Sequence, residues 1–272
     1  MTLEPTAVNT IAGLAVAAAG TRKLDLGGYY VVASTDGEIH QIDLTGDRWS
    51  DQPKRKTGNT SVRDVPSFAT YWAKHADPSS EVYAHRDSRS VVAVLDANTA
   101  DAARWGQHRL TLQFQFSSTW KAWTGADGQF MQQEAFAEFL EDNRVDIVEP
   151  AAAEMLEIAS SLSASTKAEF SSGITLSNGQ RKLSWVEDTT AKAGQRGDLT
   201  IPTEIVLGVR VFEGADYADR VTARFRYRIN AGKLTLHFKL DRPADVVGAA
   251  FEAAVNELAD ACDTTVLRGT PA

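Results

Sequence analysis

The chain has 272 residues, enough for one large domain or two small ones with a substantial core. Its apolar share of 43% and its charged share of 24% are typical of a soluble globular protein. The formal net charge of −8 argues against a general nucleic-acid binder, because duplex binding usually requires a basic surface that releases counterions.

Cys262 is the single cysteine of the sequence and lies within a C-terminal helical pattern. One cysteine can form neither an internal disulfide nor a zinc cluster, which suits a reducing cytoplasm, so we expect a small core residue. The first apolar stretch, residues 8–20, is too short and too rich in alanine to span a bilayer, and basic residues follow it instead of preceding it as in a signal peptide. The sequence predicts a soluble, cytoplasmic protein without membrane contacts.

The N-terminal part of the chain predicts a helix, a hairpin and a loop. Within residues 1–20, the pattern predicts a helix over 5–19, whose alanine-rich surface would pack on the protein's own core or on a neighbouring subunit. Two strand-like runs in 27–44 surround a Ser-Thr-Asp-Gly turn and predict a β-hairpin. Residues 45–61 are polar, rich in turn formers and without apolar periodicity, and predict a long mobile loop.

The middle of the chain mixes helices and strands. A short helix is predicted over 64–76, a second hairpin over 81–98 and a strand over 108–116. Two amphipathic helices follow over 128–143 and 149–165, because apolar residues recur at helical spacing in both. The acidic residues of the first predict a solvated face, not a metal site: Glu134, Glu138, Glu141 and Asp142.

From about residue 167 the apolar pattern changes to a two-residue period, which predicts a sheet-rich C-terminal half over 167–272. Strand-like runs occur at 168–176, 181–188, 200–212, 219–230 and 233–240, tight turns at Ser177-Asn178-Gly179 and Asn230-Ala231-Gly232, and a final helix at 243–261. No repeat, linker or clear boundary is evident. The predicted fold class is α+β, with mostly antiparallel hairpins and several amphipathic helices, in a single unit of residues 1–272.

No catalytic or cofactor-binding motif stands out. His85-Arg86-Asp87 copies the start of a kinase catalytic loop, but Val92 stands where the metal-binding asparagine belongs and no glycine-rich loop exists. The strand ending at Asp96 resembles a nucleotide-binding strand, yet no phosphate-binding loop accompanies it. The five histidines are scattered singly. We expect no enzyme activity, no metal and no cofactor.

Residues 220–240 give the clearest local pattern, a hairpin with one apolar face and one cationic face. Arg224, Arg226 and Arg228 alternate with apolar residues on the first strand, and Lys239 lies on the second. Arginines two residues apart on one face repel one another unless anions lie opposite. The arginine stripe therefore predicts an anionic partner.

Two kinds of anion could meet this stripe. Glu204 and Glu213 lie close to the hairpin in sequence, so pairing with carboxylates within the fold or across a subunit contact is the first interpretation. Nucleic acid is the alternative, although the sequence places no interleaved exposed aromatic residue on the arginine side for base stacking. In that alternative Lys54, Arg55 and Lys56 of the predicted loop would contact phosphates as well; otherwise they lie in a solvated loop or meet an acidic neighbour.

From about residue 54 to 255 the chain resembles the YfdQ-like family, which comprises uncharacterised proteins of temperate phages and prophages. The similar segments are SFATYWAKH (67–75), VVAVLDAN (91–98), STWKAW (118–123), FAEFLEDN (136–143), PAAAEML (150–156), VFEG (211–214), RFRYRI (224–229) and DRP (241–243). The resemblance implies a protein of the cytoplasm of an infected bacterial host. It implies no activity and no catalytic residue.

The order of the predicted elements also resembles the major-capsid fold of tailed phages, which encapsulin nanocompartments share. An N-terminal helix, an early hairpin with a long loop, a helical stretch and a mixed sheet region follow one another in that order. The chain departs from that fold near 146–150, where two predicted helices stand in place of one long helix. This resemblance implies a shell subunit that functions through its interfaces.

The first hypothesis is therefore a phage-encoded structural protein that self-assembles into a closed encapsulin-like shell or another large homo-oligomer, without catalysis. Its partner would be itself, and its subunit-interface candidates are Arg224, Arg226, Arg228, Lys239, Glu204 and Glu213. The alternative is an accessory nucleic-acid-binding factor in phage DNA metabolism, with Lys54, Arg55 and Lys56 as further phosphate contacts.

Overall fold

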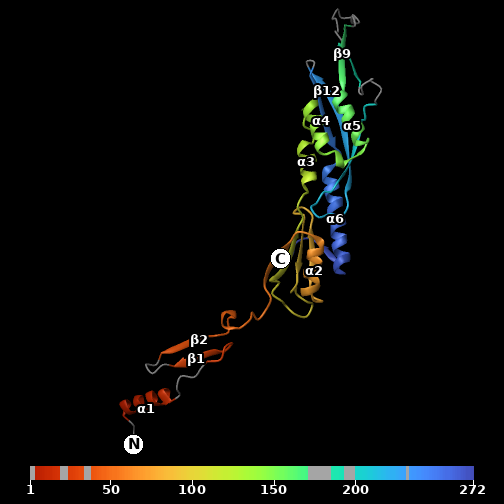
Figure 1. Cartoon of the computed structure of the whole chain (residues 1–272). Coiled ribbons are helices and arrows are strands. Elements are labelled where there is room, and N and C mark those ends of the chain that lie inside the picture. The colour runs from red at the N-terminus through yellow and green to blue at the C-terminus, as the bar shows by residue number, and fades with distance from the viewer. Residues whose placement is uncertain (1–3, 19–23, 34–37, 171–184, 193–199, 231–232) are drawn as a thin grey trace, which may run out of the picture. The chain divides into compact units, whose positions relative to one another are not determined.

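The structure is a computed structural model that describes residues 4–18, 24–33, 38–170, 185–192, 200–230 and 233–272 (Figure 1). Contacts within the chain divide it into two compact units, Met1–Gly58 and Asn59–Ala272. We expected a single unit of residues 1–272, whereas the contacts within the chain separate it into these two units. The division falls inside segment 45–61, where the sequence shows no boundary.

The described part of the N-terminal unit contains one helix and one hairpin. α1 spans Pro5–Ala18, which confirms the predicted helix. β1 (Tyr29–Ala33) and β2 (Ile39–Asp43) pair antiparallel in a two-stranded sheet, which confirms the predicted hairpin.

The prediction of loop structure throughout 45–61 is wrong in two places. A 3₁₀ turn, η1, spans Asp47–Trp49, and the strand β3 spans Gly58–Val62. A single 3₁₀ turn is too short to produce an apolar period. The sequence of β3 is Gly-Asn-Thr-Ser-Val, so this strand depends on pairing with β6 (His108–Gln113) and not on its own β-propensity.

Five strands form the first sheet of the second unit, in the order β14-β4-β5-β6-β3. β4 (Glu81–His85) and β5 (Ser90–Val94) are the predicted hairpin, and β6 is the predicted strand. β14 (Val266–Arg268) was not predicted and pairs parallel with β4. The expectation of mostly antiparallel pairing therefore holds, although β14 and β4 run parallel.

Two predicted helices, α2 (Val65–His75) and α6 (Pro243–Cys262), pack on one another. The Trp72 side chain of α2 donates a hydrogen bond from Nε1 to the backbone oxygen of Cys262 at 3.2 Å. Phe68 of α2 is fully buried. α6 has 20 residues, but neither it nor any other described helix is both long and apolar enough to cross a membrane.

The second sheet has the order β7-β13-β12-β11-β8, and its strands pair antiparallel. Its strands are β7 (Met131–Gln132), β13 (Lys233–Leu240), β12 (Asp219–Asn230), β11 (Glu204–Val209) and β8 (Ile147–Glu149). Trp123 of α3 (Ser118–Ala126) and Phe136 of α4 (Gln133–Asp142) place their rings 5.1 and 6.5 Å from the ring of Phe238 on β13. These two helices therefore cover the apolar face of the sheet.

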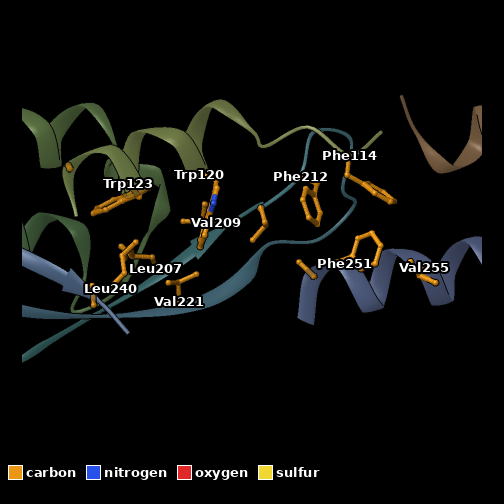
Figure 2. Packing of buried hydrophobic residues seen from close by; sticks show 14 of the residues in the cluster. Phe114, Trp120, Trp123, Leu207, Val209, Phe212, Val221, Leu240, Phe251 and Val255 are labelled. Atoms are coloured by element: carbon orange, nitrogen blue, oxygen red, sulfur yellow. The ribbon is translucent and has the colours of Figure 1, made fainter. Parts of the chain in front are cut away.

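One continuous core joins the two sheets of the second unit. Figure 2 shows Trp120 and Trp123 of α3 over Leu207 and Val209 of β11. In the same view Phe114 lies close to Phe212 and to Phe251 of α6, with ring centroids 5.2 and 5.7 Å apart. This aromatic cluster connects the end of β6 to both the second sheet and α6.

Two predicted helices are shorter than expected. The helix predicted over 128–143 begins only at Gln133, because β7 precedes it. The helix predicted over 149–165 is α5 (Ala152–Ser161), with β8 before it and β9 (Ser163–Phe170) after it. Pairing with distant strands has overridden the helical pattern at these ends. α3 was not predicted at all.

β9 pairs antiparallel with β10 (Trp185–Lys192) in a further two-stranded sheet. β9 begins and ends earlier in the sequence than the predicted run 168–176, and β10 begins and ends later than the predicted run 181–188. The turn predicted at Ser177-Asn178-Gly179 lies outside the described residues, as do Ala231 and Gly232 of the second turn.

Candidate functional site

β12 and β13 present one apolar and one polar face, as their two-residue period predicted. Phe225, Leu236 and Phe238 are at most 5% exposed. The opposite face carries the predicted stripe, and Arg226 and Arg228 are exposed there. We name this side the arginine face and define it by Arg224, Arg226, Arg228, Lys233, Thr235, His237 and Lys239.

One end of the arginine face is neutralised by carboxylates of the same chain. Arg224 donates to Asp241 at 3.1 Å and lies opposite Glu204 on the neighbouring strand. Lys239, which lies opposite Arg224 on β13, donates to Asp127 at 2.6 Å. The exposed pair of Arg224 and Asp241 contributes at most about 1 kcal/mol and mainly balances charge. The Asp127 side chain is only 14% exposed and also accepts from the backbone N–H of Leu240 at 2.8 Å, which fixes its position beside Lys239.

The other end of the arginine face is not neutralised in this way. Arg226 lies opposite His237, and Arg228 lies opposite Thr235. Within the described part of the chain, neither arginine forms an ion pair, and neither does the exposed Lys233. These three cations are therefore exposed and have no carboxylate partner among the described residues.

Phe130 brings an aromatic ring to this end of the face. β7 pairs with β13 so that Gln132 lies opposite Thr235, which places Phe130 in line with His237. The rings of Phe130 and His237 are 4.2 Å apart, and the guanidinium carbon of Arg228 lies 4.6 Å from the centre of the Phe130 ring. Phe130 remains 46% exposed. The expectation that the arginine side has no exposed aromatic residue is therefore wrong.

His237 is neutral at neutral pH. Burial lowers the pKa of its imidazole below the ordinary value of 6.5, and the charges of Arg226 and Arg228 lower this pKa further, whereas the backbone of Phe238 and the charge of Asp127 oppose the shift. The Nδ1 atom is buried and has no hydrogen-bond partner among the described residues. The imidazole therefore acts as a neutral ring between Phe130 and the arginines.

Glu213 does not lie beside the exposed arginines within the chain, and a role at a subunit contact stays a prediction. The antiparallel pairing of β11 with β12 puts Val209 opposite Asp219, so the segment after β11 runs away from the exposed arginines. Glu213 instead lies 4.0 Å from Lys121 of α3. The short distance in sequence between Glu213 and the hairpin did not predict this position. The direction of β11 determines which end of the sheet Glu213 reaches.

The basic residues Lys54, Arg55 and Lys56 lie in the N-terminal unit and are exposed. Lys54 Nζ donates to the backbone oxygen of Thr45 at 2.6 Å. A shared phosphate path with the arginine face stays a prediction, because that face belongs to the second unit.

A second candidate surface lies on the N-terminal unit. None of the side chains whose burial is described in this unit, those of residues 4–15, 24–32 and 38–58, is buried. We name the exposed large hydrophobic residues of its helix, its hairpin and the turn that precedes the hairpin the N-terminal apolar surface: Val8, Ile11, Leu14, Leu26, Tyr29, Val31, Val32 and Ile39. Their exposure ranges from 42% to 69%. Val31 and Val32 are adjacent in β1 and therefore point to opposite faces, so both faces of the hairpin expose apolar groups, and such exposure favours a contact with another surface.

A cleft of the second unit is lined by acidic groups, including Glu213, Asp216, Asp219 and Glu257, around Phe212. Burial raises the pKa of Asp219 above the usual range. Throughout the described ranges, no three histidine, cysteine or acidic side chains gather as a metal site would require. The carboxylates thus line the cleft without converging on one point.

Residues 5–271 match the model of a protein family whose description reads "Uncharacterized conserved protein (DUF2303)". The chain belongs to the DUF2303 family. The match covers both units of this DUF2303 chain, so the N-terminal apolar surface and the arginine face both lie within the family region. Comparison with curated proteins and with solved structures found no match.

The sequence missed two important residues of the arginine face in this DUF2303 chain. Asp127 and Phe130 come from the connection between α3 and β7, and both reach the face through the pairing of β7 with β13. Asp127-Gly128 is a recognisable turn signal at the helix end. Phe130 gave no such signal, because it was counted within the helix predicted over 128–143.

Proposed function

We propose that this chain is a phage-encoded structural protein that self-assembles into a large homo-oligomer and performs no catalysis. The observation that carries this proposal is the N-terminal unit, where none of the side chains described at residues 4–15, 24–32 and 38–58 is buried. A protein that functions through assembly needs such surfaces more than it needs an active site.

The N-terminal unit requires a covering surface on physical grounds. A helix of 14 residues is marginal in water by itself, and so is a two-stranded hairpin. Both elements here carry exposed apolar side chains. Burying one valine or isoleucine side chain contributes about 1.5–3 kcal/mol, so covering several of them stabilises a contact strongly. A second copy of the chain provides the covering surface in our proposal.

The contact pattern favours an assembly larger than a dimer. In our proposal, the N-terminal unit of one copy contacts a surface outside the N-terminal unit of another copy. The two surfaces in contact then differ, which makes the contact heterologous. Heterologous contacts continue from subunit to subunit and produce rings, closed shells or filaments. The order of the elements predicted from the sequence resembles that of capsid and encapsulin subunits, and we therefore propose a closed encapsulin-like shell as the specific form. The phage origin and a location in the cytoplasm of the infected host belong to the same proposal and are supported by the sequence resemblance to the YfdQ-like family.

The native mass of the purified chain tests this proposal. Light scattering after gel filtration should give a mass many times that of the 29.5 kDa subunit, and negative-stain images of the same peak should show uniform particles. The double variant Val31→Asp/Ile39→Asp places charges on one face of the hairpin and should release smaller species, because two lost apolar contacts weaken each subunit contact by about 3 kcal/mol or more.

Thr57→Asp is the matched control, because Thr57 is polar, exposed and outside the N-terminal apolar surface. This variant should assemble as the wild type does. A monomeric or dimeric wild type would overturn the proposal. Normal assembly of Val31→Asp/Ile39→Asp would show that the hairpin makes no subunit contact.

A further inference from the structure

We propose that the unneutralised end of the arginine face binds single-stranded nucleic acid, with phosphates at Arg226, Arg228 and Lys233 and a base stacked at Phe130. This inference is independent of self-assembly, because all four residues belong to the second unit. It rests on the arrangement of charge and of an aromatic ring on one side of a rigid sheet.

The charge arrangement is the first step. Arg224 and Lys239 are paired with Asp241 and Asp127, so the chain neutralises cations of this face where it supplies carboxylates. Arg226 and Arg228, one and two rows further along the sheet, form no ion pair within the described residues. Guanidinium groups with free donors bind phosphate well, because their planar donor arrangement matches its oxygens.

The spacing of these cations suits an extended strand. Alternate residues of a β-strand lie about 7 Å apart, which is comparable with the distance between successive phosphates of an extended nucleic-acid backbone. Arg226 and Arg228 are separated in this way on β12, and Lys233 continues the same face at the end of β13 nearest Arg228.

The aromatic ring is the second, independent observation. Phe130 is 46% exposed and lies against Arg228 and His237. Unpaired bases stack on phenylalanine rings and on guanidinium planes, and both are present within one cluster. A neutral His237 adds a third flat group without competing for the phosphates. An acidic protein segment would use the arginines but would not need the ring, so the combination favours nucleic acid.

Single strands are favoured over duplexes. A duplex stacks its bases against one another and leaves no base face for Phe130. Three cations also neutralise too few phosphates for tight duplex binding by a chain whose net charge is −8. With three phosphate contacts, the logarithm of the binding constant should fall against the logarithm of salt concentration with a slope of about −2.

Fluorescence anisotropy with a labelled poly(dT) strand of about 20 nucleotides tests the proposal between about 50 and 200 mM salt. The full chain should bind this strand with the stated slope and more tightly than a duplex of the same length. Arg226→Gln/Arg228→Gln and Phe130→Ala should each weaken binding about tenfold or more, and Phe130→Trp should retain it. Arg220→Gln is the matched control, because Arg220 lies on the same strand but is paired with Glu149.

The same measurements on the Val31→Asp/Ile39→Asp variant show whether a dispersed subunit binds the strand. Comparison with the wild type then shows whether assembly hides the arginine face. Absence of binding by both forms at low salt would overturn the inference. So would equal binding of duplex, equal displacement by poly-glutamate, or unchanged affinity in Phe130→Ala. If Arg226→Gln/Arg228→Gln instead lost assembly and kept its affinity for poly(dT), the arginines would face carboxylates of another subunit, and the inference would be wrong.

Discussion

Asp64 defines the first turn of α2. Its side chain accepts a hydrogen bond from the backbone N–H of Ser67 at 2.7 Å, and it thereby satisfies one of the free donors at the helix start. Hydrogen bonds from the side chain and the backbone of Ser67 lower the pKa of Asp64 below its usual 3.8. The charged form is thus the one that caps the helix most strongly.

We expect Asp64→Ala to lower the free energy of unfolding by about 1 kcal/mol at neutral pH, measured by urea denaturation. Asp64→Ser is the control and should lose much less, because a hydroxyl group also caps. A carboxyl group with a lowered folded pKa stabilises above its unfolded pKa and loses that contribution as the pH falls through the folded pKa. The difference between wild type and Asp64→Ala should therefore shrink in acid, and a constant difference would contradict the role of the charge.

Cys262 lies at the end of α6 and is 8% exposed. Burial raises the pKa of its thiol to about 11. Since only the thiolate reacts with thiol reagents, we expect native protein to resist such a reagent at about pH 8 and to react fully once unfolded in denaturant. Rapid reaction of the native chain, followed by absorbance, would show that the contact between α2 and α6 opens easily.

At the scale of elements, the sequence predicted best where the pattern is local. The two-residue period of β12 and β13 correctly assigned Phe225, Leu236 and Phe238 to the core and the arginines to the other face. The hairpin of β4 and β5 and the helices α2 and α6 were equally clear. In each case a long run of alternating or helical spacing determines which side chains face the core.

Short elements escaped prediction because tertiary contacts create them. β14 has three residues and depends on parallel pairing with β4. α3 has nine residues, and its clearest signal is Ser117, whose hydroxyl caps the helix by accepting from the backbone N–H of Trp120 at 2.9 Å. Ser117 followed by tryptophans at helical spacing could have predicted α3.

The sequence predicted the arginines of the candidate site but not the residues that other segments bring to it. The alternation of residues within β12 predicts which arginines share one face. It does not predict which of them pair with carboxylates. Asp127 and Asp241 reach Lys239 and Arg224 from two connections, and only the strand pairing brings them there. Phe130 likewise depends on the register between β7 and β13. Distinguishing paired from unpaired cations therefore required the structure.

At the scale of the whole molecule, stability is distributed unevenly between the two units. Every described buried residue lies between Val65 and Cys262, within the second unit. The folded state of that unit should therefore not depend on residues 1–57. The N-terminal unit, by contrast, has exposed apolar side chains whose burial our proposal assigns to contacts between copies.

We expect a chain of residues 58–272, which keeps β3 intact, to unfold cooperatively with a Tm within a few degrees of that of the dispersed Val31→Asp/Ile39→Asp variant. Circular dichroism on heating measures this, and light scattering should show that the truncated chain no longer forms the large assembly. A truncated chain that assembles like the full-length protein would move the subunit contacts to the second unit. A truncated chain that fails to fold would show that residues 1–57 complete the core, and the N-terminal apolar surface would then serve the subunit's own fold.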